Sequence, residues 1–278
     1  MPDLALIRWE VILHWTATLL YAMSTLAFVY GVNFDKEKVL SAGAVLAAVG
    51  LLPHSAGLIA RWLAVGHGPY MTRGEVLSSN AWAALIVFLA VLRWRPQLKP
   101  AGLLIVPLAM LMTAAGLFLT PEIRLLPPSL RSFWLVLHVA FAKLGAAGML
   151  ISLAAAVLYL LKEGRPETGW RAQAPALDAL DEYSGRWAGF GFAFWTIMIA
   201  AGAIWAQQSW GRYWAWDPIE TWSLITWLLF GMHLHLRRFF SWSGRGAAWT
   251  LGACFLMSAF TVLGVPLITQ GLHTEYFR

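Results

Sequence analysis

The chain has 278 residues, of which 59% are hydrophobic and only 12% are charged. A soluble domain carries about a quarter of its residues as charged side chains, so this composition excludes an ordinary soluble protein. The single cysteine, Cys254, excludes an internal disulfide, a zinc knuckle and a redox cysteine pair. The net charge of +6 is explained by basic loops on one side of a membrane, so binding to nucleic acid is not expected.

Eight apolar segments, separated by charged residues or by Pro and Gly, predict an all-α polytopic membrane protein with about eight transmembrane helices. To within a few residues they are 11–30, 40–63, 78–94, 101–119, 132–161, 186–206, 220–240 and 247–268. No basic region precedes the first segment, so it is expected to be a membrane span and not a cleaved signal peptide. The whole chain, 1–278, is expected to form a single integral-membrane domain.

Lysine and arginine are more frequent at one end of the spans, in the loops 31–39, 93–100, 162–186 and 237–246. Because cytoplasmic loops are enriched in these residues, this end is expected to be cytoplasmic in the cell membrane. Both termini, and the loop between spans six and seven, then lie outside. The polar stretch 162–185 predicts a cytoplasmic connector with a short amphipathic helix around Ala176–Tyr183.

Tryptophan is unusually frequent, with 17 residues in the chain. Six of them lie in or beside the connection 207–222 between spans six and seven: Trp205, Trp210, Trp214, Trp216, Trp222 and Trp227. If the connection is extended, Trp214 and Trp216 share one face and form a flat apolar wall, which suits a large planar ligand. The alternative is an interfacial aromatic belt, but a belt would scatter tryptophan over many span ends.

The same connection ends with a helix-start pattern. In Asp217-Pro218-Ile219-Glu220, the aspartate fits an N-cap, the proline fits the first helical position, and the glutamate closes a capping box. Capping alone accounts for both carboxylates, so neither is predicted to be catalytic.

Three of the seven histidines are placed to bind the iron of a haem, which takes imidazole ligands, often from both faces. His138 lies near the outer end of span five, and His273 lies in the tail after span eight. Both are on the side of the Trp-rich connection. His235 lies deeper in span seven, where an ionisable residue is a functional candidate. His233 faces nearly the opposite side of the same helix.

The string W-G-x-x-W-x-W-D-P-x-E-x-W, from Trp210 to Trp222, resembles the WWD signature of haem-handling membrane proteins of cytochrome c maturation. The positions of His138, His235 and the closing Gly-Leu-His273 resemble the CcsA branch of that family, also called ResC. The resemblance implies haem b as cofactor, with His138 and His273 as axial ligands at the outer surface and His235 at a haem site within the membrane. It implies that the WWD loop contributes Trp210, Gly211, Trp214, Trp216, Asp217 and Trp222 to haem binding.

The resemblance also implies a function, the membrane subunit of a cytochrome c synthase (haem lyase). Such a subunit moves haem to the outer face and presents it for thioether attachment to the Cys-X-X-Cys-His segment of apocytochrome c. No catalytic side chain is expected, because the cofactor and the substrate thiols supply the chemistry. The implied partners are a CcsB/ResB-type membrane protein, apocytochrome c, haem and the lipid bilayer. A haem transporter, a CcmC-like haem chaperone and a haem-b electron-transfer subunit are the alternatives.

Other polar residues have weaker assignments. Gly66-His67-Gly68-Pro69, followed by Glu75, resembles an N-terminal motif of the same branch, with altered residues in between. His14 and His54 are expected to be structural. Lys143 is a candidate partner for a haem propionate or for Glu75.

Overall fold

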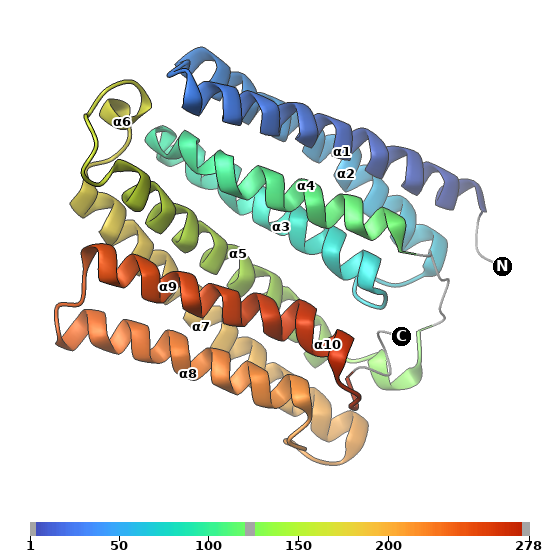
Figure 1. The fold of residues 1–278 in the computed structure, drawn as a ribbon. Coiled ribbons are helices and arrows are strands. Elements are labelled where there is room, and N and C mark those ends of the chain that lie inside the picture. The colour runs from blue at the N-terminus through green and yellow to red at the C-terminus, as the bar shows by residue number, and fades with distance from the viewer. Residues whose placement is uncertain (1–3, 120–125, 274–278) are drawn as a thin grey trace. The chain divides into compact units, whose positions relative to one another are not determined.

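The computed structural model describes residues 4–119 and 126–273, and every regular element within these ranges is helical. Long helices occupy all eight apolar segments: α1 (Leu4–Asn33), α2 (Glu37–Val65), α3 (Arg73–Trp94), α4 (Gly102–Phe118), α5 (Phe133–Lys162), α7 (Leu177–Trp210), α8 (Pro218–Phe239) and α9 (Gly244–Ala259). Shorter helical elements adjoin or connect them: η1 (Pro96–Ala101), η2 (Pro128–Leu130), α6 (Trp170–Gln173), the π-helical turn η3 (Phe260–Gly264) and α10 (Val265–Ile268). The all-α prediction is confirmed (Figure 1).

Seven helical stretches in the described part of the chain are long and apolar enough to cross a membrane, and the protein is a multi-pass membrane protein. The seventh predicted span, 220–240, forms α8, which is not among these seven. α8 is 22 residues long but carries Glu220, two histidines and two arginines, which lower its hydropathy. Membrane helices are therefore confirmed, whereas their number of eight is not. Exposed side chains such as Leu26 and Leu52 are suited to face lipid.

The connector before span six differs from its prediction. A helix is present where one was expected around Ala176–Tyr183, but it is not a short separate one, because Leu177–Tyr183 form the first turns of α7, which runs unbroken for 34 residues. The polar residues there pair along and across helices: Arg186 bonds Glu182 one turn away at 2.5 Å, and Asp181 pairs with Arg237 of α8 at 2.8 Å. These pairs let a polar sequence continue the helix.

The chain divides into two compact units. Unit 1 comprises Met1–Leu126 with Gly164–Ala176, and unit 2 comprises Pro127–Glu163 with Leu177–Arg278. In unit 1, α1 packs along α2 and against α4, and α3 packs along α4 (Figure 1). Trp170 of α6 is buried, and its backbone N–H donates to Asp35 Oδ1 at 3.1 Å, which fixes the connector to the turn after α1. The prediction of a single domain stays a prediction.

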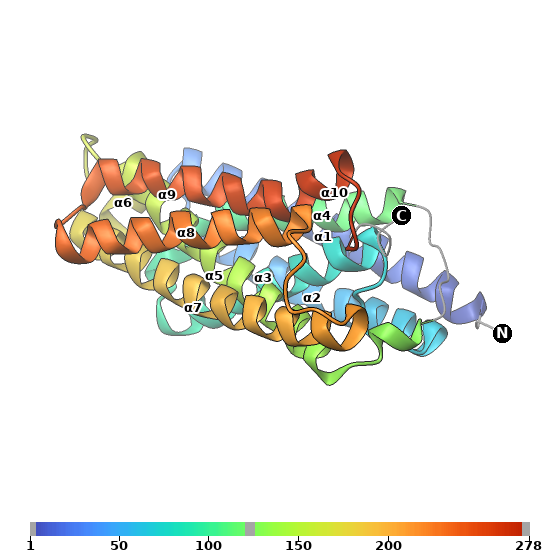
Figure 2. The same ribbon diagram turned by 90° about the horizontal axis from the view of Figure 1, so that it is seen from below.

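Unit 2 is built around the pair α5 and α7, with α9 packing against α5 and α8. Glycines let the first two helices approach closely: a Cβ added to Gly148 would lie 3.1 Å from the backbone nitrogen of Gly191. The core nearby is formed by large apolar side chains, including Met149, Trp195, Phe230 and Leu251. The start of α5, the α7–α8 connection and the segment after α10 lie at the same end of unit 2 (Figures 1 and 2).

Candidate functional site

The α7–α8 connection is held in an unusual backbone conformation. Gly211 ends α7 with a φ of 73°, and Trp216 has a φ of 57°, in the left-handed region that bulky residues rarely occupy. Such a conformation costs on the order of 1–3 kcal/mol and persists only when neighbouring contacts impose it. Glu220 supplies those contacts, because its Oε2 accepts hydrogen bonds from the backbone N–H of Ala215 at 2.8 Å and of Asp217 at 3.2 Å. Glu220 thus clamps the backbone on both sides of Trp216.

The predicted flat wall of Trp214 and Trp216 is wrong. Their ring centroids are 5.9 Å apart, but the ring planes are nearly perpendicular, at 86°. Trp216 is 70% exposed, whereas Trp214 is half-buried, and its indole nitrogen has no hydrogen-bond partner among the described residues. The left-handed residue breaks the alternation of an extended strand, which is why the two indoles do not share a face. The connection therefore offers one exposed indole and one inserted indole.

Asp217 has the predicted capping role, and it also contacts the C-terminal tail. Its Oδ1 accepts from Ile219 N at 3.0 Å within a complete capping box. The same Oδ1 lies 3.1 Å from Nδ1 of His273. The tail backbone runs directly against this carboxylate, because a Cβ added to Gly271 would collide with Asp217 Oδ2. Asp217 therefore joins the start of α8 to the Gly-Leu-His tail.

The contacts of Asp217 favour its charged form. Burial opposes ionisation, but His273 and the backbone N–H groups of Ile219 and Leu272 outweigh it, so the pKa of this carboxyl lies below its usual value. A carboxylate at this position can only accept hydrogen bonds, so Nδ1 of His273 is the donor. The imidazole is thereby held as the Nδ1–H tautomer.

His138 and His273 are brought together by Trp205. The ring of His138 stacks on Trp205 with centroids 6.4 Å apart and planes 29° apart. The ring of His273 meets Trp205 edge-on at 5.8 Å and Trp210 at 5.0 Å. The rings of Trp205 and Trp210 also contact each other, with centroids 4.8 Å apart. Two predicted ligands from distant parts of the sequence thus meet at an aromatic cluster beside the WWD loop.

Both imidazoles are oriented in the manner of metal ligands. Nδ1 of His138 lies 2.9 Å from the backbone oxygen of Met198 and must donate to it, because a carbonyl only accepts. Nδ1 of His273 donates to Asp217. In each ring this leaves the lone pair on Nε2, and ligating histidines characteristically donate their other N–H to a carbonyl or carboxylate in this way. Two such imidazoles are the kind of donor set that haem iron takes.

The other predicted ligand, His235, does not join this cluster. It lies 17 residues after Pro218, roughly 25 Å along α8. Its ring is exposed and contacts Phe239 at 4.6 Å and Phe240 at 6.0 Å. His233 faces the interior of unit 2 instead, with 2% exposure and Nδ1 3.1 Å from the Thr250 hydroxyl. The opposite facing of the two histidines agrees with the helical spacing.

The remaining WWD residues occupy different surroundings. The Trp222 ring packs edge-on against Phe260 of η3, with centroids 4.9 Å apart, while Gly211 is exposed. Sequence reasoning missed the carbonyl of Met198 and the contacts of Trp205 with both imidazoles. Met198 and Trp205 are seven residues apart and so lie on one face of α7, but only the pairing of α5 with α7 reveals what that face holds.

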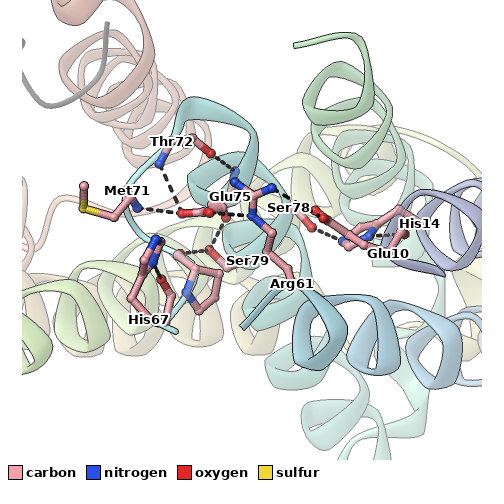
Figure 3. A network of polar contacts seen from close by, with 11 residues as sticks. Glu10, His14, Arg61, His67, Met71, Thr72, Glu75, Ser78 and Ser79 are labelled. Atoms are coloured by element: carbon pink, nitrogen blue, oxygen red, sulfur yellow. Dashed lines mark hydrogen bonds and ion pairs between the residues drawn. The ribbon is translucent and has the colours of Figure 1, made fainter. Parts of the chain in front are cut away.

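A separate polar network fills the interior of unit 1 (Figure 3). His14 Nδ1 donates to the Glu10 carbonyl at 2.8 Å, so its Nε2 accepts from the Ser78 hydroxyl at 2.9 Å. His54 Nε2 must then donate to the same oxygen at 2.9 Å, and its Nδ1 accepts from Tyr21 at 3.0 Å. Every ring nitrogen of the two histidines has a hydrogen-bond partner. This arrangement agrees with the expected structural roles.

The outer part of this network anchors the loop after α2. The buried Arg61 donates through Nε to Glu75 Oε1 at 2.8 Å, and its Nη1 lies 3.5 Å from Glu10. The other oxygen of Glu75 accepts from the backbone of Met71 and Thr72, as Figure 3 shows. Glu75 thus holds the backbone just before α3, and the Ser79 hydroxyl of α3 donates to the Pro69 carbonyl of the Gly-His-Gly-Pro motif at 3.1 Å. A cavity of about 60 Å³ lies beside Arg61 and Glu75.

Comparisons with known proteins agree with this geometry. The family model for the cytochrome C assembly protein matches residues 9–273. The chain is similar to the cytochrome c biogenesis protein CcsA of Microcystis aeruginosa. The two are 32% identical over an alignment of 322 positions, which covers 97% of this chain and 98% of that protein. It is 37% identical to CcsA of Chlamydomonas reinhardtii over 230 residues, 79% of this chain and 64% of that protein.

A solved structure is also similar. The cytochrome c haem lyase CcmF superposes with a TM-score of 0.72 at 18% identity, over 98% of this chain and 48% of that one. At this identity the likeness shows the fold. The family model, which covers nearly the whole chain, and the CcsA relatives together carry the assignment. The chain therefore belongs to the cytochrome c assembly protein family, as a CcsA-type protein of cytochrome c biogenesis.

Proposed function

We propose that this protein is the membrane subunit of a cytochrome c synthase that holds haem b between His138 and His273 and presents it for thioether attachment to apocytochrome c. The observation that supports this most directly is the shared geometry of the two imidazoles. Each engages Nδ1 in a hydrogen bond, each keeps Nε2 for iron, and both meet at Trp205 beside the WWD loop.

The residues of the chain have distinct tasks in this function. His138 and His273 fix the iron, and Trp205 and Trp210 provide aromatic contacts beside it. Trp216, exposed at the tip of the loop, is available to a docking substrate. Bound haem would supply the two vinyl groups, across each of which one substrate S–H adds. The protein contributes position, worth many orders of magnitude in rate when reacting groups are aligned.

His235 serves a second haem site within the membrane in this proposal. Its exposed ring on α8 is accessible to a CcsB/ResB-type membrane partner, which would supply the opposite ligand. Arg238, also exposed, lies 5.9 Å from the Phe239 ring and could pair with a propionate. The WWD loop and both termini lie outside the cell membrane, as the distribution of basic residues indicates.

The experiment replaces each proposed ligand with glycine and adds free imidazole. His138→Gly and His273→Gly should both lose haem on purification and fail to assemble cytochrome c, and imidazole should restore part of each, because a free ligand fills the place of the missing side chain. His14→Gly in unit 1 is the matched control, since any defect there should not respond to imidazole. Full haem retention in either ligand variant removes that histidine from the site.

A further inference from the structure

Gly202 lies inside α7, eight residues before the helix ends, where glycine weakens a helix relative to alanine. The need for glycine at this position is explained by the atoms that a side chain at residue 202 would contact. A Cβ at position 202 would lie 2.5 Å from Nδ1 and 2.9 Å from Cε1 of His138, and the third nearest atom is also on that ring. The space beside Gly202 is thus filled by the imidazole of His138.

Gly202 differs in this respect from other glycines between α5 and α7. A Cβ at Gly148 would meet backbone atoms of Gly191, and a Cβ at Gly145 would meet backbone atoms of Trp195 and Gly191. Those glycines serve close helix packing, the usual role of small residues in membrane helices. At Gly202 the three nearest atoms all belong to one side chain, so helix packing does not explain it.

Gly202 is part of a larger arrangement on one face of α7. Met198, Gly202 and Trp205 are spaced by four and three residues, so they line up on the same side of the helix. Met198 accepts the Nδ1–H of His138, Gly202 leaves room for the ring, and Trp205 stacks on it. These three residues are called the His138 seat below.

We propose that Gly202 is a positioning residue for His138, because the bare helix surface at this position lets the imidazole donate Nδ1–H to the Met198 carbonyl and so keep the lone pair of Nε2 available to bind iron. The inference rests on the proposed function, in which His138 is an iron ligand. It adds that α7 prepares the ligand in advance, through backbone groups and a missing side chain.

The proposal makes an unusual prediction for Gly202→Ala. The three atoms nearest to the added methyl group all belong to the His138 ring, so the ring must move, but no backbone atom is among them and the helices need not separate. Alanine also favours the helix. Moving the ring costs its contacts with Met198 and Trp205, and the gain in helix propensity offsets this loss. The variant should therefore be about as stable as the wild type, yet its haem affinity should be about 10–100-fold lower, the usual loss when a residue that orients a metal ligand is changed.

Two alanine variants serve as matched controls. Gly189→Ala lies on the same helix with nothing within 4 Å of the new Cβ, so haem retention should be unchanged. Gly57→Ala repeats the collision on another histidine, with a Cβ 2.6 Å from Nδ1 of His14, in unit 1. Any defect of Gly57→Ala should not respond to imidazole, because no iron ligand has been displaced.

The measurements are haem content, the absorption spectrum and thermal stability of the purified proteins, with and without imidazole. Imidazole should restore haem to Gly202→Ala. In a His138→Gly background, Gly202→Ala should have no further effect, since the ring with which it collides is gone. Wild-type haem content in Gly202→Ala, or a defect that imidazole leaves unchanged, overturns the proposal.

This experiment can refute the ligand role of His138 and the positioning role of Gly202 separately. If His138→Gly retains haem fully, the ligand assignment in the proposed function is wrong, and the role of Gly202 falls with it. If His138→Gly loses haem and regains it with imidazole while Gly202→Ala behaves like the wild type, the proposed function stands and the positioning role alone is refuted.

Discussion

Replacing Asp217 separates its two roles, because asparagine and alanine remove different contacts. The carboxylate caps α8 through Ile219 N and holds the imidazole of His273 through the same oxygen. Asparagine can still accept both hydrogen bonds with its carbonyl oxygen, but it is uncharged, and it turns an N–H group toward the Gly-Leu-His tail. Alanine removes both contacts.

The magnitudes follow from these contacts. A hydrogen bond to a charged partner contributes about 1.5–3 kcal/mol and a neutral one about 0.5–1.5, so Asp217→Asn should weaken the hold on His273 by about 1 kcal/mol. That corresponds to roughly a fivefold to tenfold loss of haem affinity. Asp217→Ala loses the whole contact, and also a helix cap worth about 1 kcal/mol. The cap alone should lower the unfolding temperature by roughly 2–4 °C.

Haem content after purification and the thermal unfolding of haem-free protein are the two assays. Asp217→Asn should keep the unfolding temperature and lose haem moderately, whereas Asp217→Ala should lose both. Imidazole should restore haem to Asp217→Ala, because the defect acts through His273. Asp35→Asn is the matched control, since Asp35 also accepts a backbone N–H but lies in unit 1. Full haem retention in Asp217→Asn would show that the charge does not hold His273.

Three further predictions concern topology and the two polar interiors. Reporter fusions at Gly244 should read cytoplasmic and fusions at Arg212 extracytoplasmic, and the reverse pattern would place the WWD loop inside the cell. His233→Ala should lower the free energy of unfolding by about 1–3 kcal/mol while leaving haem content intact, since it removes a buried hydrogen-bonded ring. Glu75→Gln should destabilise unit 1 by about 3 kcal/mol in thermal or denaturant unfolding, because it leaves the buried Arg61 without its nearest carboxylate; an unchanged midpoint would contradict this.

Local signals in the sequence predicted the features that depend on local chemistry. The start of α8 at Asp217-Pro218 was predictable because capping needs residues within one turn of each other. The apolar segments predicted where the long helices lie. They did not predict where α7 starts, because Asp181 in its first turns forms an ion pair with Arg237 of another helix. The predicted wall of Trp214 and Trp216 was wrong because Trp216 has a left-handed backbone conformation, which is held by the two hydrogen bonds of Glu220 on either side of it.

Features that depend on contacts between residues far apart in the chain could not be predicted from the sequence. Gly202 is one of 24 glycines, and nothing near it in the chain marks it, because the ring it accommodates lies 64 positions earlier. Gly271 is a similar case, because a side chain there would collide with the carboxylate of Asp217, which lies far away in the sequence. In both cases the missing side chain is explained only by the group that occupies the space.

The two imidazoles are held by opposite ends of the same connection. His138 contacts the C-terminal part of α7, at Met198 to Trp205, and His273 is held by the cap of α8, at Asp217. The WWD loop is the covalent link between these two supports. Its left-handed tryptophan and its clamp by Glu220 therefore constrain the backbone that joins the two supports, in addition to presenting indoles. In the proposed function a rigid, strained link is understandable, because a pair of iron ligands must be held to within about 0.5 Å of the productive geometry.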